Sequence, residues 1–385
     1  MLHGKIHFSV WSCVMSRPIE TAAAVLVDYN EPLEIRSIKI PEPEPRAAIV
    51  RVEASTMCGT DIHIWRGEYA SSGLSKLPLI PGHEIVGRIV ALGSERRVDA
   101  LNRPLAEGDL VAWAYAWCGE CYWCTVAKQP TACERARMYG WGPADLSPYI
   151  TGGFSEYVYI MPQCSIVKVP NGLDPALAAS GTCAFRTIVH GYEKIGRIDT
   201  SDTVVIQGSG PVGLYALAYA IQSGARRTVV IGAPESRLAI AKKWGADVIL
   251  DVQKSQVAER NEQILEMTDG RGADLVVECS GAGAAFVEGM DLLRRGGRYL
   301  VIGQADPRAV EIHPTHFNLR QLTVSGTMSG DISHYYKALN FLRDHQDRFS
   351  FSDLLGSRNS LEQVGNALDA LESMREMKPI IIPSP

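Results

Sequence analysis

Four cysteines lie within sixteen residues, in the run C-G-E-C-Y-W-C-T-V-A-K-Q-P-T-A-C. Four thiolates at this spacing can surround a zinc ion as a closed tetrahedron, which is typical of a structural site because no position remains for a substrate. Two disulfides, or four unrelated buried thiols, are the alternatives, but disulfide frameworks belong mainly to short secreted chains. The predicted ligands, which we call the cysteine lobe, are Cys118, Cys121, Cys124 and Cys133.

A second group of residues has the composition of a metal centre with an open position. Cys58 begins C-G-T-D-I-H, His83 lies in P-G-H-E, and Cys183 lies in S-G-T-C-A-F. Two sulfurs and one nitrogen leave a fourth position for water or a substrate oxygen, as a catalytic zinc requires. Glu84 is predicted as an alternating ligand or a supporting group, and Asp61 is suited to hold the far N–H of the imidazole. A lone cysteine such as Cys183 is more often a small buried side chain, so the prediction depends on the combination of motifs.

A glycine-rich turn predicts binding of a dinucleotide. Gly208, Gly210 and Gly213 form G-x-G-x-x-G between the apolar run T-V-V-I-Q and an apolar helical pattern. Glycines let the backbone approach a pyrophosphate, and the start of the helix offers free N–H groups and partial positive charge. An ordinary tight turn is the alternative, but the surrounding strand and helix patterns favour the binding motif.

The choice between NAD and NADP is poorly marked in the sequence. An acidic residue about 20 positions after the turn would select NAD, but Gly232 occupies that position. Ser236 and Arg237 could bind a 2′-phosphate, whereas Glu235 would repel one or accept a hydrogen bond from a ribose hydroxyl. The sequence slightly favours NAD and leaves NADP possible.

The secondary-structure elements that must position these residues show two different sequence patterns. Short alternating apolar runs between Gly and Pro extend from about residue 22 to 170, which is typical of a mostly β domain. A helix is predicted from Pro175 to about Ile195. Strands then alternate with helical patterns to about Gly326, which predicts a parallel, doubly wound sheet. Two amphipathic helices follow, and the terminal K-P-I-I-I-P predicts a strand that returns to the first domain.

Composition excludes several classes of protein. Apolar residues make up 46% of the 385 residues, charged residues make up 21%, and the net charge is −5. These values predict a globular protein of two or three domains, with no electrostatic basis for binding nucleic acid or an anionic membrane. No apolar run reaches the roughly 20 residues that span a bilayer. Nine unevenly spread cysteines favour a reducing compartment, predicted to be the cytoplasm. Residues 1–18 are expected to be an extension and not a signal peptide.

The motifs C-G-T-D-x-H, G-H-E, the cysteine lobe, G-x-G-x-x-G and V-V-E-C-S-G follow one another along the chain. In this order they resemble those of the zinc-dependent medium-chain alcohol dehydrogenases, from about Ala22 to Pro383. The resemblance implies an α/β fold with two domains. A GroES-like, mostly β catalytic domain would comprise residues 19–184 and 327–385, and a doubly wound Rossmann domain would comprise residues 185–326.

The resemblance also implies an activity, namely oxidation of an alcohol to a ketone or aldehyde with hydride transfer to NAD(P). Catalytic zinc is expected on the open group around Cys58, and a second zinc on the cysteine lobe. A proton relay is expected through Thr60 and His63, for which a surface histidine is the alternative. The residues expected to contact the coenzyme are Gly208, Gly210, Pro211, Val212, Gly213, Gly232, Glu235, Arg237 and Lys378.

Two features depart from or refine the family pattern. Cys124 and Cys133 enclose eight residues where seven are usual, which makes zinc in the cysteine lobe the less secure of the two. The third catalytic ligand, Cys183, is the cysteine of simple alcohol dehydrogenases and not the glutamate typical of polyol dehydrogenases. A sugar alcohol is therefore disfavoured as the substrate.

The residues expected around the substrate are aromatic. By resemblance they are Tyr69, Trp113 or Tyr115, and Phe154, with residues 138–153 shaping the rim. The set has no charged anchor, so we predict a secondary, hydrophobic or cyclic alcohol as the small-molecule partner. A polyol or threonine-type dehydrogenase is the rival enzyme, and a non-catalytic zinc and dinucleotide binding module is the rival of another class. A homodimer or homotetramer is expected.

Overall fold

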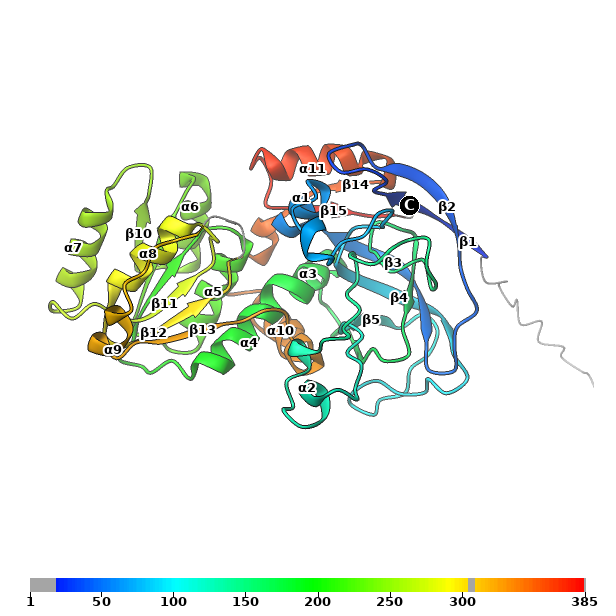
Figure 1. Ribbon diagram of the computed structural model, residues 1–385, viewed down its shortest axis with the longest axis horizontal. Helices are drawn as coiled ribbons and strands as arrows, with labels where there is room; N and C mark the ends of the chain where they lie inside the picture. Colours follow the sequence, from blue (N-terminus) through cyan, green and yellow to red (C-terminus); the bar gives the residue numbers. More distant parts are fainter. Residues whose placement is uncertain (1–18, 304–308, 384–385) are drawn as a thin grey trace, which may run out of the picture.

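The computed structural model describes residues 19–303 and 309–383 (Figure 1). The predicted extension, residues 1–18, lies outside the described residues. The described strands form a two-stranded, a six-stranded and a seven-stranded sheet. The two larger sheets confirm the predicted combination of a mostly β part with a parallel α/β part.

The seven-stranded sheet takes strands from both ends of the chain. Its order is β14-β15-β3-β4-β5-β7, and β6 also pairs with β3. The last strand, β15, runs antiparallel to β3, which confirms that the K-P-I-I-I-P segment returns to the first part of the chain. The strands of this part, with the separate pair β1 and β2, are β1 Glu20–Val25, β2 Glu34–Lys39, β3 Ala48–Thr56, β4 Glu84–Leu92, β5 Leu110–Trp113, β6 Tyr157–Ile160, β7 Ile166–Lys168, β14 Leu355–Asn359 and β15 Lys378–Ile381.

The helices around this sheet are mostly short. At the end of the chain, α11 packs against α1, the helix that follows β3 (Figure 1). None of the helices in the described ranges is long and apolar enough to cross a membrane. The bounds of the helices around this sheet are α1 Gly59–Trp65, α2 Tyr122–Thr125, α3 Pro175–Ser180, α10 Ile332–His345 and α11 Val364–Glu372. A further helix, α4 Arg186–Ile195, contacts α10 and the six-stranded sheet.

The six-stranded sheet is parallel throughout, with the order β10-β9-β8-β11-β12-β13. This is the doubly wound order, whose crevice lies where the direction of winding reverses, between β8 and β11. Figure 1 shows its helices flanking the strands in the yellow and green part of the chain. The bounds are β8 Thr203–Gln207, α5 Pro211–Gln222, β9 Arg227–Gly232, α6 Glu235–Trp244, β10 Val248–Asp251, α7 Val257–Met267, β11 Ala273–Glu278, α8 Gly283–Leu292, β12 Leu293–Val301, α9 Thr315–Arg320 and β13 Thr323–Gly326.

The helix predicted for residues 175–195 is interrupted. Asp174 caps its start by accepting the N–H groups of Ala176 and Leu177. A π-helical segment, Gly181–Phe185, then separates α3 from α4. Such wider turns are a common local adjustment at functional sites, and apolar periodicity alone does not reveal them.

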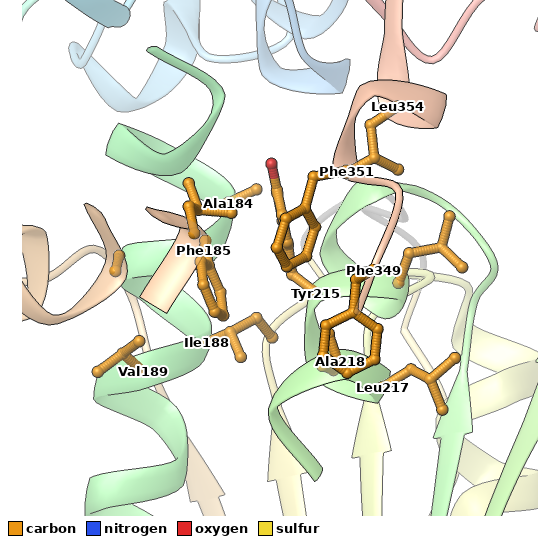
Figure 2. Packing of buried hydrophobic residues seen from close by; sticks show 14 of the residues in the cluster. Ala184, Phe185, Ile188, Val189, Tyr215, Leu217, Ala218, Phe349, Phe351 and Leu354 are labelled. Atoms are coloured by element: carbon orange, nitrogen blue, oxygen red, sulfur yellow. The ribbon is translucent and has the colours of Figure 1, made fainter. Parts of the chain in front are cut away.

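One apolar core joins the two larger sheets. In Figure 2, Phe185 lies beside Tyr215 of α5, and Phe349 and Phe351 come in from the chain after α10. The rings of Phe185 and Tyr215 are stacked with 4.7 Å between their centroids, and the ring centroids of Tyr215 and Phe351 are 6.0 Å apart. Burial of large aromatic rings contributes strongly to packing. This packing therefore fixes the π-helical segment relative to α5, the first helix of the six-stranded sheet.

Candidate active site

Cys58, His83, Glu84 and Cys183 come together although they are far apart in the sequence. One ligand atom from each lies within 4.8 Å of the ligand atoms of the other three. Cys58 Sγ is 3.1 Å from His83 Nε2. His83 and Glu84 are buried, and the two cysteines are partly buried. The structure thus assembles the whole predicted open group.

The pairing of β3 with β4 explains how two of these residues meet. Thr56, at the end of β3, is in register with Glu84, at the start of β4, so Cys58 and His83 leave the sheet at the same edge. Asp61 then holds both: the Cys58 N–H donates to Asp61 Oδ2 at 2.9 Å, and His83 Nδ1 lies 3.2 Å from Asp61 Oδ1. A carboxylate at Nδ1 leaves Nε2 as the ring nitrogen for a metal.

The π-helical segment carries the remaining thiol. The side chain of Thr182, next to Cys183, accepts the Ile85 N–H at 3.2 Å and donates to the Ala179 carbonyl at 2.7 Å. These bonds fasten the segment to β4, one residue beyond Glu84. Cys183 is therefore positioned by β4 as well as by its own helix.

Glu84 is engaged by a lysine from the end of the chain. Lys378 Nζ is 2.7 Å from Oε1 and 2.5 Å from Oε2 of Glu84, and the Thr56 hydroxyl donates to Oε2. Burial raises the pKa of Glu84 to about 7, against the opposing effect of Lys378. The sequence prediction assigned Lys378 to the coenzyme. Its ammonium group forms a buried ion pair with Glu84, a contact that the sequence did not reveal.

The donor set fits a zinc ion with one open position. Cys58, Cys183 and His83 offer two sulfurs and one nitrogen, the usual ligands of zinc. A hydrogen bond from the Cys183 thiol holds the pKa of Cys58 well below its usual range, which favours the thiolate that binds metal. Because Glu84 is occupied by Lys378, three protein ligands remain.

The cysteine lobe also fits zinc, but as a closed site. Its sulfur–sulfur distances are 3.6 Å for Cys121–Cys124, 3.9 Å for Cys121–Cys133 and 4.0 Å for Cys118–Cys124. Four sulfurs at about 2.3 Å from a tetrahedral zinc would be about 3.8 Å apart. All eight cysteines in the described ranges are free thiols, which excludes disulfides among them.

Short turns absorb the eight residues between the last two lobe cysteines. A 3-10 turn, Pro130–Ala132, leads into Cys133, and Lys128 has a positive φ of 54°. The Cys118 N–H donates to Cys133 Sγ at 3.4 Å. The backbone amide of Glu120 is the main cause that lowers the pKa of the Cys118 thiol to about 6. The unusual gap is thus compatible with four converging thiolates.

The glycine turn has the geometry that a pyrophosphate needs. Gly208 has a φ of 108°, and a Cβ on Gly213 would lie 1.9 Å from the Gly208 carbonyl oxygen. A Cβ on Gly210, the residue before α5, would meet no atom within 4 Å. Gly208 needs to be glycine because of its positive φ, and Gly213 because of the close packing. Gly210 leaves open space over the start of the helix.

The residues expected to discriminate between NAD and NADP differ in their packing and in their ion-pair partners. Gly232 ends β9, and a Cβ there would lie 2.6 Å from Ser209 Oγ, so a larger side chain is excluded by the turn itself. Glu235 is 77% exposed and pairs with Lys254 at 2.7 Å. Arg237 is partly buried, and no ion pair or hydrogen bond engages its guanidinium within the described ranges.

A cavity of about 310 Å³ joins the metal-binding group to the glycine turn. Cys58 and His63 line it from one side, and Pro211, Val212 and Arg237 line it from the other. Lys378 lines it as well. One predicted metal ligand, Cys58, therefore shares a cavity with residues predicted to contact the coenzyme, and such proximity is what transfer between two bound molecules requires.

His63 and Thr60, the predicted relay, lie on α1. His63 Nδ1 is 2.6 Å from Glu68 Oε2, and the His63 side chain is 20% exposed. The imidazole can therefore contact both the cavity and solvent. Thr60 is partly buried in the first turn of α1, two residues after Cys58.

The expected substrate residues lie in three different places. Trp113 and Tyr115 line a small cavity with His83. Tyr69 packs on Trp141 of the predicted rim, with 4.9 Å between ring centroids. Phe154 instead lies fully buried behind Gly82, where a Cβ would come within 2.6 Å of its ring.

The sequence prediction missed Tyr335 and Arg186. Tyr335 comes from α10 and lines the same small cavity, while Arg186 lies behind it at the start of α4. Neither residue belongs to a motif, and only the packing of α10 against α4 brings them to the site.

Comparison with known proteins agrees with this geometry. The family description "Alcohol dehydrogenase GroES-like domain" matches residues 44–171, and "Zinc-binding dehydrogenase" matches residues 211–344. The chain is 34% identical over 367 residues to 5-exo-hydroxycamphor dehydrogenase of Pseudomonas putida, covering 93% of this chain and 98% of that protein.

Solved structures give the same result. An alcohol dehydrogenase of Thermotoga maritima has a TM-score of 0.89 and 32% identity, covering 95% of this chain and all (100%) of that chain. A dehydrogenase of Sinorhizobium meliloti bound to NADP has a TM-score of 0.81 and 26% identity, covering 94% of this chain and 99% of that one. The chain therefore belongs to the zinc-dependent medium-chain alcohol dehydrogenases, enzymes that oxidise an alcohol with NAD(P).

Proposed function

We propose that this enzyme oxidises secondary alcohols with an apolar, cyclic skeleton to ketones. The observation that carries the proposal is the wall beside His83, which is formed by Trp113, Tyr115 and Tyr335 and includes no Asp, Glu, Lys or Arg among its described residues. This lining carries no ionised group, which favours an uncharged substrate over an amino acid or a phosphorylated compound. The name of the Pseudomonas putida relative, 5-exo-hydroxycamphor dehydrogenase, denotes a cyclic terpenoid alcohol and supports the same class.

In this proposal Cys58, His83 and Cys183 hold the catalytic zinc. When bound there, zinc supplies Lewis-acid chemistry that lowers the pKa of a hydroxyl group. Asp61 keeps the His83 ring in the orientation that presents Nε2, and Lys378 holds Glu84 within an ion pair. The four lobe cysteines hold a second zinc that takes no part in the reaction.

The hydroxyl proton must leave the cavity while the carbinol hydrogen passes to the coenzyme as a hydride. We propose that Thr60 orients the hydroxyl and that His63 carries the proton to solvent. Support comes from the position of His63, which lines the cavity and is 20% exposed. Glu68 engages Nδ1, so Nε2 is the ring nitrogen available to take a proton.

Two rival functions have weaker support. A threonine-type dehydrogenase would need a charged group to bind an amino acid, and the described lining beside His83 includes no Asp, Glu, Lys or Arg. A polyol dehydrogenase typically has a glutamate as the third zinc ligand, whereas Cys183 takes that place here. A non-catalytic binding module would be expected to have lost part of the metal-binding group. All four members of that group converge here.

The test of the function is a screen of initial rates with purified, zinc-containing protein, followed by the absorbance of NAD(P)H. Cyclic secondary alcohols such as cyclohexanol and borneol are expected to give kcat/KM at least about tenfold above that for sorbitol or threonine, because each additional buried apolar group gains about 1 kcal/mol or more. A higher rate with sorbitol or threonine would contradict the proposed substrate class.

We infer that NADP is the preferred coenzyme, although the sequence alone slightly favoured NAD. Gly232 offers no carboxylate to a ribose, and Glu235 is engaged by Lys254. Arg237 lines the shared cavity with a guanidinium that has no partner within the described ranges. An unpaired arginine beside the glycine turn suits a 2′-phosphate.

Replacing Arg237 with alanine is expected to lower kcat/KM for NADP by about tenfold or more, because a charge-assisted hydrogen bond to phosphate is worth about 1.5–3 kcal/mol. The value for NAD should stay within about twofold. The matched control is Arg226→Ala, an exposed arginine that precedes β9 at the end opposite Gly232. Equal losses for NAD and NADP would refute recognition of the 2′-phosphate by Arg237.

We propose that the chain forms a homodimer or a homotetramer. The support is β13, an edge strand of the six-stranded sheet, with exposed Val324 and with Leu319 and Met328 exposed close by in the sequence. Exposed apolar residues at a strand edge favour pairing with a second copy. Sedimentation at several concentrations would test this, and a monomer at every concentration would refute it.

We also propose two domains with the predicted boundaries, a catalytic domain of residues 19–184 and 327–385 and a coenzyme domain of residues 185–326. The origin of β14 and β15 at the end of the chain supports this division. The free thiols of both metal-binding groups support a reducing compartment, and we propose the cytoplasm.

A further inference from the structure

A small cavity lies directly beside the metal-binding group. His83, Trp113, Tyr115 and Tyr335 are among the residues that line it. It has about 10 Å³ of space for the centre of a water molecule. This is room for a single oxygen-sized group. Any group that enters lies next to His83, and therefore next to the reacting end of a substrate.

Two hydroxyl groups at this cavity lack a protein partner. Tyr115 is 5% exposed and Tyr335 is 2% exposed, yet neither hydroxyl forms a hydrogen bond to any described residue. Neither hydroxyl oxygen belongs to the fully buried polar atoms that lack a partner, so both oxygens remain accessible to a water-sized group. A buried tyrosine hydroxyl normally has a partner, and leaving one unmade costs about 1–3 kcal/mol. These two hydroxyls are therefore available to a group that enters the cavity.

Tyr139 lines the same cavity but is different. Its hydroxyl donates to the Tyr159 carbonyl at 3.0 Å and accepts the Met161 N–H at 2.9 Å. The hydrogen bonds of Tyr139 are thus satisfied within the protein. The unpartnered state is a property of Tyr115 and Tyr335, and not of every tyrosine around the cavity.

Arg186 fixes the two unpartnered rings. Its guanidinium carbon lies 4.8 Å from the ring centroid of Tyr115 and 4.9 Å from that of Tyr335. The side chain is 1% exposed and donates to the Thr182 carbonyl and the Ser329 hydroxyl. No carboxylate within the described ranges forms an ion pair with it. A buried cation beside two ring faces is stabilised by the ring quadrupoles and restrains both rings.

The chemistry of this arrangement is that of two neutral donors. Burial raises the pKa of Tyr115 and of Tyr335, so both phenols remain protonated at neutral pH. Arg186, the cation that contacts both rings, is not among the lining residues. The cavity therefore suits a neutral acceptor, such as a carbonyl or ether oxygen, better than a carboxylate or phosphate.

We propose that Tyr115 and Tyr335 donate hydrogen bonds to a second oxygen of the substrate, so that the preferred substrate is a cyclic alcohol that also carries a carbonyl or ether oxygen. This inference rests on the proposed oxidation of cyclic secondary alcohols at the neighbouring site. The tyrosines act on specificity, and Arg186 acts as the positioning residue behind them. A hydroxyketone meets the requirement, whereas a simple cycloalkanol leaves both donors unpaired.

The test compares cyclohexanol with 3- and 4-hydroxycyclohexanone, which share a ring and differ by one carbonyl oxygen. The zinc-containing wild-type enzyme is expected to oxidise the better hydroxyketone with kcat/KM at least about tenfold above that for cyclohexanol, because the simple alcohol leaves buried donors unpaired. Tyr335→Phe and Tyr115→Phe keep the ring beside Arg186 and remove only the hydroxyl. Each is expected to reduce this ratio about threefold to tenfold.

Tyr139→Phe is the matched control, because its hydroxyl is bonded within the protein, and it should leave the ratio within about twofold of wild type. Thermal unfolding of each variant separates loss of fold from loss of specificity. Equal kcat/KM for cyclohexanol and both hydroxyketones in the wild type would overturn the inference, as would an unchanged ratio in both tyrosine variants. Failure of the proposed function is distinguishable, because the wild type would then oxidise none of the three alcohols, and this would overturn both proposals.

Discussion

Replacing Cys58 with serine or His83 with alanine is expected to lower kcat by at least about a thousandfold, equivalent to about 4 kcal/mol of transition-state stabilisation. Cys58 Sγ and His83 Nε2 lie 3.1 Å apart and face one site, so removal of either leaves an incomplete ligand set. The variants should lose one zinc per chain and keep the other. Zinc content by mass spectrometry, measured beside the steady-state rate, checks both effects.

Binding of the coenzyme should survive these substitutions. The glycine turn lies between β8 and α5, and Arg237 lies on α6, so both are outside the metal-binding group. Titration of NADPH fluorescence should give a Kd within about threefold of wild type, a change of less than about 1 kcal/mol. The matched control is Cys164→Ala, a buried thiol outside both metal-binding groups that contacts the Tyr139 hydroxyl at 3.3 Å. A variant without its catalytic zinc but with wild-type turnover would contradict the assigned site.

The convergence of Cys58 and His83 could be predicted from the sequence because their positions follow from short-range rules. Cys58 and His83 border the long strands β3 and β4, whose antiparallel pairing brings their ends together. The glycine turn is equally local, since its three glycines lie between one strand and one helix. In each case, spacing within the chain determines spacing in the structure.

Other parts of the site depend on contacts that no local pattern contains. Tyr335 reaches the small cavity only because α10 packs against α4, and Lys378 reaches Glu84 across 294 positions of the sequence. The sequence prediction therefore named Lys378 only as a coenzyme contact, without its ion pair to Glu84, and described a substrate wall without Tyr335. The pairing of Glu235 with Lys254, which alters the expected coenzyme, is likewise visible only in the folded chain.

The π-helical segment shows that tertiary contacts can also determine local secondary structure, which a sequence pattern does not reveal. The apolar pattern of residues 175–195 predicts a single helix, and the interruption at Gly181–Phe185 depends on the bond from Ile85 to Thr182 and on packing against α5 and α10. Tertiary contacts can override the helical period at such positions. The predicted helical stretch that contains Cys183 is present, and only its π-helical widening at Gly181–Phe185 was not predicted.

Replacing Cys121 with serine is expected to remove the other zinc and to destabilise the protein without a comparable loss of turnover. The cysteine lobe has little apolar packing of its own, since α2 spans only four residues and Tyr122 and Val126 are 62% and 67% exposed. Metal ligation must supply most of its stability. A loss of about 3 kcal/mol would lower Tm by roughly 6–12 °C at about 2–4 °C per kcal/mol.

The two cysteine substitutions should therefore have opposite signatures, although each removes one zinc per chain. Cys121→Ser should open the lobe to limited proteolysis between Cys118 and Cys133 and keep kcat within about threefold, less than 1 kcal/mol in activation free energy. Cys58→Ser should abolish turnover and leave the lobe resistant. If wild type and Cys121→Ser each contained only one zinc per chain and had the same Tm, the extra residue between Cys124 and Cys133 would have left the lobe without metal in the wild type. The stability would then have to come from protein contacts alone.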